Sequence, residues 1–304
     1  MISKISRSFF LHVSKNSYLN KAARRWGLKL GASQVVVGDR IESMVKKVKE
    51  LNNEGFLCTL DHLGEFVTSR DEAVEATNHI IKTVETIARE GLKSQISVKL
   101  TQLGFDIERD FCVQNMYRIL HEAKKNQIFV TIDMEDYPHC ERTLEVLKEL
   151  RKTFTNVGTV IQAYLFRSEQ DVIEWKGIPL RLVKGAYNES KTVAFQDKKV
   201  IDENFIKLIN LHLLSGSFTA IATHDHHIIN KVKEIVQEHR IPNDRFEFQM
   251  LYGFRKELQR NLVKEGYSLR VYVPYGEDWF AYYMRRLAER PQNISFALRG
   301  FFSK

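Results

Sequence analysis

The sequence predicts a single closed (β/α)8 barrel, and three observations indicate this fold. Short runs of apolar and β-branched residues alternate eight times with longer segments of helical periodicity. Each strand-plus-helix unit takes roughly 20 to 40 residues, the length that a parallel crossover connection requires. A polar residue stands at the end of each expected strand, where a barrel builds its active site.

The expected strands are the eight apolar runs at residues 56–60, 96–100, 128–132, 159–163, 180–183, 219–223, 246–249 and 269–273. Segments of helical period lie between them, at 69–90, 110–125, 141–151, 202–213 and 230–238. The five prolines all fall at the edges of these elements, and no linker or repeat interrupts them. We therefore expect one catalytic barrel domain over residues 46–304, preceded by a helical, basic segment over residues 1–45.

Polar side chains at the strand ends predict the position of the functional site. In chain order they are Asp61, Lys99, Asp133, Gln162, Lys184, His224, Gln249 and Tyr272. The carboxyl ends of parallel barrel strands meet at one mouth, so these residues are expected to form a ring there. For Lys99 and Asp133, a purely structural ion pair between neighbouring strands is an open alternative.

A helix is expected directly after the eighth strand, over residues 282–289, where it would cover the barrel mouth. Its spacing places Tyr282, Arg285, Arg286 and Glu289 on one face, beside an apolar stripe. Two adjacent, partly buried guanidinium groups require an anion, because unpaired buried charge is costly. Glu289 can neutralise one, and the other could bind a carboxylate or phosphate. A solvated face with an intrahelical Arg–Glu pair is the alternative that spacing leaves open.

The composition, 43% apolar and 28% charged, is that of an ordinary soluble protein. No apolar run approaches the roughly 20 residues that span a bilayer. The three cysteines are odd in number and lack CxxC spacing, which favours a reducing compartment over a disulfide framework. A cytoplasmic location is therefore expected.

The net charge of +8 is unevenly distributed, because the first acidic residue is Asp39. The preceding basic residues are interleaved with apolar ones such as Phe9 and Trp26. A segment of this kind could lie on the inner face of the cell membrane. It also resembles an organelle transit peptide in composition, although Trp26 is unusual there. A helix that packs its apolar face on the barrel is a further interpretation.

Motifs that would indicate other chemistry do not occur. The sequence has no GxGxxG, GxxxxGK[ST] or GxSxG motif, which argues against a Rossmann dinucleotide fold, a P-loop and a hydrolase elbow. The run His224-Asp225-His226-His227 does not predict a metal site, because adjacent side chains in an extended segment point in alternate directions. We expect neither a metal nor a nucleic-acid partner.

Two strand-end lysines leave a choice of chemistry. Lys99 or Lys184 could form a Schiff base, as strand-end lysines of barrels often do. The run Arg181-Leu-Val-Lys184-Gly185-Ala186-Tyr187 indicates another use. Its small residues let a planar or phosphorylated ligand approach the backbone, while Arg181 points inward. This combination suits an anionic cofactor with an aromatic ring system.

Nine motifs occur in order between about residues 55 and 296. They are Asp61-His-Leu-Gly-Glu65, Val98-Lys99-Leu100, Thr131-Ile-Asp133-Met-Glu135, Ile161-Gln162-Ala163-Tyr164, Arg181-Leu-Val-Lys-Gly-Ala-Tyr187, Ala222-Thr-His-Asp225, Phe246-Glu-Phe-Gln249-Met-Leu251-Tyr-Gly253, Arg270-Val-Tyr272-Val-Pro274 and Tyr282-x-x-Arg285-Arg286-x-x-Glu289. In these motifs the chain resembles the monofunctional bacterial proline dehydrogenases, flavin-dependent enzymes that begin proline catabolism. The aldehyde dehydrogenase domain of their bifunctional relatives is expected to be absent from this chain.

The resemblance implies a role for each matching residue. The carboxylate of L-proline is expected to bind Arg285, Arg286 and Lys99. The proline ring would contact Ala186, Tyr187, Leu251, Tyr272 and Tyr282. Asp133 is expected beside substrate and flavin, organising Tyr272 and Lys99, and Arg181 near the reactive edge of the flavin. The expected FAD contacts are Met134, Gln162, Val183, Lys184, Gly185, Ala186, Thr223, His224, Asp225, Gln249 and Glu289.

The implied reaction is FAD-dependent oxidation of L-proline to 1-pyrroline-5-carboxylate, the first step of proline degradation to glutamate, with electrons passed to a membrane quinone. Hydride transfer requires the ring carbon beside nitrogen to be held against the flavin. Two other classes stay open from the residues alone. One is a Schiff-base lyase or aldolase that uses Lys99 or Lys184. The other is a peripheral membrane protein whose barrel only binds a small carboxylate.

Overall fold

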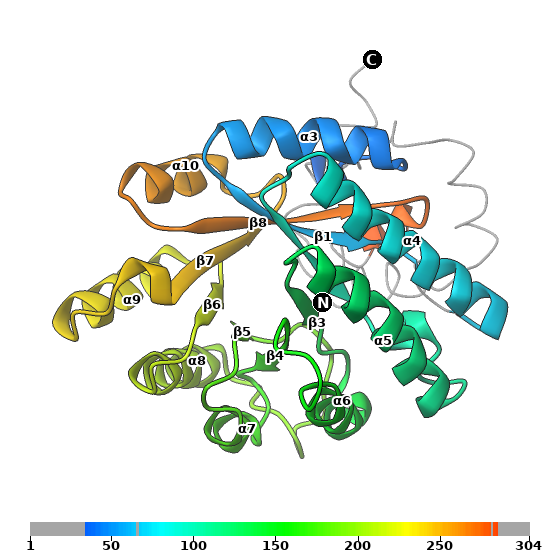
Figure 1. Cartoon of the computed structure of the whole chain (residues 1–304). Helices are drawn as coiled ribbons and strands as arrows, with labels where there is room; N and C mark the ends of the chain where they lie inside the picture. Colours follow the sequence, from blue (N-terminus) through cyan, green and yellow to red (C-terminus); the bar gives the residue numbers. More distant parts are fainter. Residues whose placement is uncertain (1–33, 65–66, 281, 285–304) are drawn as a thin grey trace.

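Eight parallel strands close into one barrel in the computed structural model, in the order of the sequence (Figure 1). The structure describes residues 34–64, 67–280 and 282–284. The barrel prediction is therefore confirmed. Most of the expected N-terminal extension and of the C-terminal helix lies outside the described residues, so both stay predictions.

The strands coincide with the eight predicted runs, with small shifts at their ends. They are β1 (Leu57–His62), β2 (Ser94–Val98), β3 (Val130–Ile132), β4 (Val157–Gln162), β5 (Leu180–Val183), β6 (Thr219–Ala222), β7 (Phe246–Leu251) and β8 (Leu269–Tyr275). The pairing of β1 with β8, from Leu57 opposite Arg270 to His62 opposite Tyr275, closes the barrel. Because β2 ends two residues earlier than expected, Lys99 lies just beyond that strand.

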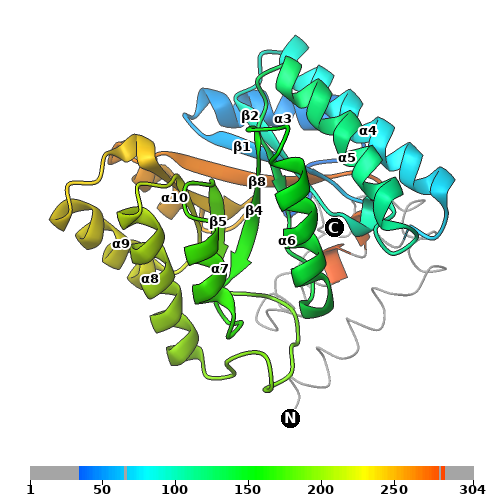
Figure 2. The ribbon, with the colours of Figure 1, turned by 60° about the horizontal axis from the view of Figure 1, so that its bottom comes forward.

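Helices follow the strands and surround the barrel. They are α4 (Arg70–Arg89), α5 (Arg109–Lys125), α6 (Tyr137–Leu150), α7 (Ser168–Glu174), α8 (Lys198–Leu214), α9 (His226–Glu238) and α10 (Lys256–Lys264), with α3 (Ile41–Asn53) before β1. A view turned by 60° shows α6 and α7 alongside β4 (Figure 2). Eight strand-plus-helix units were predicted, but no bounds were given for α3, α7 and α10. Helix α3 also runs across the predicted boundary between residues 45 and 46, where the catalytic domain was expected to begin.

Local sequence explains where the longer helices begin. Ser69 and Glu72 form a reciprocal capping box at the start of α4. Asp197 accepts two backbone N–H groups at the start of α8, and Asp225 accepts one from His227 at the start of α9. Because these helices follow strand ends, their caps lie at or near the barrel mouth. Asp225 therefore has a structural role as well as its predicted cofactor role.

The main core fills the layer between the strands and the surrounding helices, because the residues that alternate with it along the strands, such as Asp61 and Arg181, face the barrel interior. Residues such as Leu60, Val130, Leu182 and Phe248 are fully or almost fully buried. A second, smaller cluster joins the two ends of the described chain, and consists of Val36, Leu63, Trp279, Tyr282, Tyr283 and Met284. Tyr282 thus belongs to the same apolar cluster as Leu63, which lies just beyond β1.

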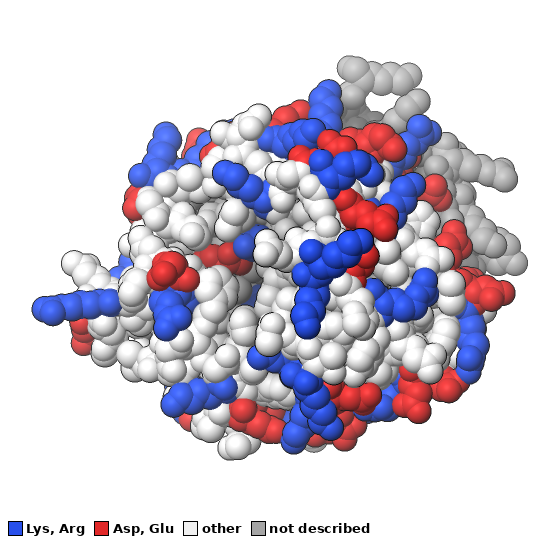
Figure 3. Space-filling model, in the orientation of Figure 1, with Lys and Arg blue, Asp and Glu red and all other residues white. Residues whose placement is uncertain are grey.

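The surface carries both signs of charge. Basic and acidic side chains are interspersed over the described part of the face in Figure 3. Among the described helices, none is long and apolar enough to cross a membrane. The basic N-terminal segment that prompted the membrane prediction lies almost entirely outside the described residues.

Candidate active site

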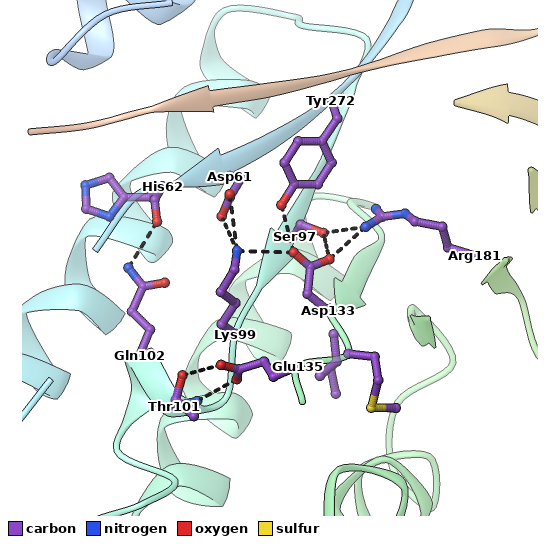
Figure 4. Close-up of polar contacts among 12 residues, drawn as sticks. Asp61, His62, Ser97, Lys99, Thr101, Gln102, Asp133, Glu135, Arg181 and Tyr272 are labelled. Atoms are coloured by element: carbon purple, nitrogen blue, oxygen red, sulfur yellow. Dashed lines mark hydrogen bonds and ion pairs between the residues drawn. The ribbon is translucent and has the colours of Figure 1, made fainter. Parts of the chain in front are cut away.

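Asp133, directly after β3, is the centre of a buried polar cluster at the carboxyl ends of the strands (Figure 4). Its Oδ1 accepts hydrogen bonds from Ser97 Oγ and from Arg181 Nη1, each at 2.7 Å. Its Oδ2 accepts one from the Tyr272 hydroxyl at 2.7 Å and one from Lys99 Nζ at 3.3 Å. Four groups from β2, β5, β8 and the residue after β2 therefore hold one carboxylate in a single orientation.

Strand geometry explains why these side chains meet. Residues two apart on a strand face the same side, so Ser97 near the end of β2 and Lys99 just beyond it both point to the barrel axis. Arg181 is the second residue of β5 and reaches across the axis, with its guanidinium carbon 5.4 Å from the centre of the Tyr272 ring. Its Nη1 also donates to Ser97 Oγ at 3.0 Å.

Lys99 lies between two carboxylates. Its Nζ contacts both oxygens of Asp61, on β1, at 3.2 Å and Oδ2 of Asp133 at 3.3 Å. The expected ion pair between Lys99 and Asp133 is thus present, but Lys99 is shared with a second acid. Two carboxylates stabilise the charged ammonium, whereas a Schiff base requires the neutral amine. This arrangement disfavours Lys99 as a Schiff-base lysine.

The two carboxylates of this cluster have opposite pKa shifts. Burial raises the pKa of Asp61, and the attraction of Lys99 offsets this only in part. Burial acts in the same direction on Asp133, but Lys99, Arg181 and two hydroxyl donors outweigh it and lower its pKa. Burial also raises the pKa of the Tyr272 hydroxyl well above its usual range. Asp133 is therefore an ionised acceptor and Tyr272 a protonated donor at neutral pH.

Gln162, at the end of β4, lies beside this cluster and keeps one buried acceptor unpaired. Its Nε2 donates to the backbone oxygens of Met134 at 3.5 Å and Glu135 at 3.1 Å. Its Oε1 has no hydrogen-bond partner among the described residues. Nε and Nη2 of Arg181 are also buried and also lack a hydrogen-bond partner among the described residues. Buried polar atoms of this kind are costly unless a partner satisfies them, which indicates a ligand with donors and acceptors here.

Three residues predicted to bind the cofactor form a second group, after β5 and β6. Lys184 Nζ lies 3.1 Å from Asp225 Oδ2 and 2.5 Å from Oδ1 of Asp202, on α8. The Thr223 hydroxyl accepts the backbone N–H of Asp225 at 3.1 Å. Burial opposes ionisation of Asp202 and Asp225, but Lys184 together with Lys198 and, at Asp225, the backbone N–H of His227 outweighs it, so the pKa of both acids is lowered. Lys184 is thus an ion-pair partner rather than a Schiff-base candidate.

His224, Leu251 and Gln249 are held by contacts within the protein. The backbone N–H of Leu251 donates to His224 Nε2 at 3.0 Å, which leaves the ring proton on Nδ1 in the neutral form. Gln249 Nε2 donates to Oε1 of the buried Glu247 at 2.6 Å, and Arg270 pairs with the same oxygen at 2.7 Å. These hydrogen bonds within the protein hold the side chains of His224 and Gln249 in place without a bound ligand.

Glycine is needed at position 185 for a structural reason that differs from the predicted one. Its φ is +114°, and a Cβ there would lie 2.2 Å from the Tyr164 ring. Glycine is therefore required by the backbone and by Tyr164 even without a bound ligand. Tyr187, predicted to line the substrate pocket, is 40% exposed. Val183 and Ala186 flank this glycine turn at the end of β5.

The predicted carboxylate-binding helix is only partly described. Residues 279–280 and 282–284 are helical, which confirms that a helix begins directly after β8. Tyr282 is buried there. Arg285, Arg286 and Glu289 lie outside the described residues, so their predicted roles stay predictions.

Sequence reasoning missed three members of these groups. Ser97 precedes Lys99 by two residues, so strand alternation could have placed it on the same face. Asp61 was recognised as a strand end but given no role. Asp202 is an ordinary acidic residue of a long helix, and no sequence signal links it to Lys184.

A parallel barrel with a buried ionic cluster at the carboxyl ends of its strands defines the class of (β/α)8-barrel enzymes. Comparison with known proteins narrows the class. The family model described as "Proline dehydrogenase" matches residues 44–299. The chain belongs to the proline dehydrogenase family and is an enzyme of that family.

Curated relatives support this assignment over the full chain. "Proline dehydrogenase 2" of Bacillus subtilis is 51% identical over 302 residues, which cover 99% of this chain and 100% of that protein. "Proline dehydrogenase" of Deinococcus radiodurans is 40% identical over 309 residues, covering 99% of each chain. Among solved structures, proline utilization A (PutA) from Bdellovibrio bacteriovorus, inactivated by N-propargylglycine, matches with a TM-score of 0.80 at 28% identity. That match covers 90% of this chain and 34% of the other.

Proposed function

We propose that this enzyme oxidises L-proline to 1-pyrroline-5-carboxylate, with FAD as the hydride acceptor. The observation that carries the proposal is the convergence of Lys99, Asp133, Arg181 and Tyr272 at one end of the barrel. All four stand in motifs by which the chain resembles the proline dehydrogenases, and relatives named for that activity match the whole chain.

The substrate carboxylate is expected to bind Lys99 together with Arg285 and Arg286. In the described part of the site, Lys99 offers an ammonium on a side chain that is only 17% exposed. The hydroxyl of Tyr272 contacts the same oxygen of Asp133 as Lys99 does, so the ring of Tyr272 lies near the ammonium. With Ala186, Tyr187, Leu251 and Tyr282 it would confine the five-membered ring and hold the reacting carbon in place.

The balance of charge in this cluster bears on the protonation of the substrate amine. Hydride leaves from an amine that has lost its extra proton, so the site must disfavour the ammonium form. The described cluster pairs two cations, Lys99 and Arg181, with two acids, Asp61 and Asp133, and is neutral as a whole. Any positive excess that disfavours the substrate ammonium would therefore come from Arg285 and Arg286.

The described residues fit a flavin at the proposed position. The unpaired Gln162 Oε1 can accept a hydrogen bond, and the unpaired Nε and Nη2 of Arg181 can donate. A flavin ring carries donors and acceptors on one edge, and it supplies the two-electron acceptor for a hydride. We propose that it contacts Met134, Gln162, Arg181, Val183, Lys184, Gly185, Ala186, Thr223, His224, Asp225, Gln249 and Glu289.

The electron acceptor and the cell location are further parts of the proposal. We infer a membrane quinone as the acceptor, in the first step of proline degradation to glutamate, at the inner face of the cell membrane. Support comes from the basic segment with interleaved apolar residues in the first thirty positions. Removing residues 1–30 should weaken binding to anionic vesicles and leave activity with a soluble dye intact. Unchanged vesicle binding would contradict this part.

Proline-dependent reduction of a redox dye tests the proposed activity. The wild-type enzyme should reduce the dye with L-proline. Arg285→Met plus Arg286→Met should abolish this activity while the flavin stays bound. Dye reduction that is absent in the wild type, or equal in both proteins, would overturn the proposal.

A further inference from the structure

Asp61 is a buried acid that the proposed reaction does not yet use. It lies on β1, opposite Ser97 of β2 and Pro274 of β8, and is 2% exposed. In Figure 4 its carboxylate points to Lys99, whereas the ring of the next residue, His62, points away from the cluster. Strand alternation explains this division, since adjacent residues face opposite sides of the barrel wall.

We propose that Asp61 is the positioning residue for Lys99, and that it holds the Lys99 ammonium where a substrate carboxylate can bind it. The inference rests on the proposed function, in which Lys99 contacts the carboxylate of proline. It extends that function by assigning substrate affinity to a residue that does not itself need to touch the substrate.

The Lys99 ammonium lies at nearly equal distances from the two acids. Lys99 Nζ is 3.2 Å from both oxygens of Asp61 and 3.3 Å from one oxygen of Asp133. A lysine is a point charge on a flexible four-carbon stem, so a single partner would leave it free to rotate about that contact. Acids on two sides fix the ammonium between β1 and β3.

The two acids differ in their other partners. Asp133 is also bound by Ser97, Arg181 and Tyr272. In the part of the chain that the structure describes, Lys99 is the one cation that pairs with Asp61. Asp61 therefore depends on Lys99 for its charge balance, whereas Asp133 keeps other donors when Lys99 is lost.

Loss of the Asp61 charge should therefore move the Lys99 ammonium in one direction. Without the charge of Asp61, the ammonium is drawn toward Asp133, which is ionised and already bound on three sides. A lysine held there is displaced from its position between the two acids, which is the position from which the proposed function has it bind the substrate carboxylate. Substrate affinity should fall, while the groups around Asp133 and the rate of the chemical step change little.

Asp61→Asn tests this, because it removes the charge and preserves the shape. We expect KM for L-proline and the inhibition constant of cyclopentanecarboxylate to rise about tenfold each, with kcat changed by less than about threefold. Cyclopentanecarboxylate has the ring and the carboxylate but no oxidisable amine, so it reports binding alone. Asp61→Glu keeps the charge and should raise both constants less than Asp61→Asn does.

A double-mutant cycle separates positioning from a general structural effect. Lys99→Met should raise both constants, and adding Asp61→Asn in that background should raise them no further. The double variant has no unpaired buried charge at this pair, so it supplies the comparison even if Asp61→Asn alone does not fold. Asp171→Asn is the matched control, since Asp171 is another buried aspartate paired with a cation, Arg167, but lies on α7. It should leave both constants unchanged.

Three results would overturn the inference. They are unchanged binding constants in Asp61→Asn, an added rise from Asp61→Asn in the Lys99→Met background, and equal effects of Asp61→Asn and Asp171→Asn. If Lys99→Met leaves both constants unchanged, the proposed carboxylate contact of Lys99 fails first. If the wild type does not oxidise proline, the proposed function itself fails.

Discussion

Arg181 Nη1 donates a 2.7 Å hydrogen bond to Asp133 Oδ1 across the interior of the barrel. The two residues belong to β5 and the end of β3, which are separated by β4 and do not pair. Their contact therefore joins two strands that are not neighbours in the sheet, through the space where the site lies. Arg181 is 6% exposed, so each partner neutralises a charge that is out of water.

Arg181→Met should destabilise the protein by about 3–5 kcal/mol, because Asp133 would lose a buried counter-charge. Adding Asp133→Asn should restore part of that loss by removing the unpaired charge. Urea unfolding of the wild type, both single variants and the double variant measures the coupling. Strictly additive losses would show that the two side chains do not depend on each other.

Ser97→Ala removes one hydroxyl that donates to Asp133 and accepts from Arg181. Its free energy of unfolding should fall by about 1–3 kcal/mol, and kcat/KM for proline should fall with it. Ser94→Ala on the same strand is the control, since the buried Ser94 hydroxyl has no partner within the described residues. The control should change stability by less than about 0.5 kcal/mol. Equal losses in the two variants would contradict a special role for Ser97.

Tyr272→Phe keeps the ring beside Arg181 and removes the donor to Asp133. Loss of a hydrogen bond to a charged acceptor should lower kcat/KM for proline about tenfold or more. Tyr275→Phe is the comparison, because the Tyr275 hydroxyl bonds to Thr83 of α4, on the outer side of the same strand. That variant should lose stability but keep its kinetic constants. A kinetic defect of the same size in both variants would contradict a specific role of the Tyr272 hydroxyl in the reaction.

Stability should decline in mild acid through buried His212. Burial lowers the pKa of His212 to about 4, whereas an unfolded histidine has a pKa near 6.5. Between these values the unfolded chain binds a proton that the folded protein excludes. The contribution of His212 to the free energy of unfolding should therefore fall by about 1.4 kcal/mol per pH unit as the pH drops from 6.5 to 4.

His212→Asn removes that titration, so its stability deficit relative to wild type should shrink as the pH falls. Urea unfolding at several pH values measures the deficit. The exposed His226 serves as the control position, and His226→Asn should follow the wild-type slope. A deficit for His212→Asn that stays constant with pH would contradict the assignment.

The barrel could be predicted from the sequence because its strands are compact β-branched runs with polar ends. Strand boundaries were harder to predict. In β2 the apolar run continues to Leu100, yet the strand ends at Val98 and a short 3-10 turn at Thr101–Leu103 follows. No bounds were predicted for helix α3, although its buried residues, Met44, Val48 and Leu51, recur at i, i+4 and i+7, the spacing of an amphipathic helix.

The membership of the site was predictable where a residue stands in a strand-end motif. Asp133, Arg181, Lys99 and Tyr272 were all expected together, and the structure brings them into one network. Asp61 as the second partner of Lys99 depends on the stagger of β1 against β2, which periodicity does not reveal. The pairing of Lys184 with Asp202 depends on the rotation of α8 about its axis, which is set by packing.

Anaerobic addition of L-proline to the purified protein tests the central claim most directly, because it follows the absorbance of the proposed flavin. The account predicts that the flavin absorbance bleaches with L-proline. It also predicts that Arg285→Met plus Arg286→Met binds the flavin but does not bleach at the same proline concentration. A protein that contains no flavin, or a bound flavin that proline leaves oxidised, would contradict it.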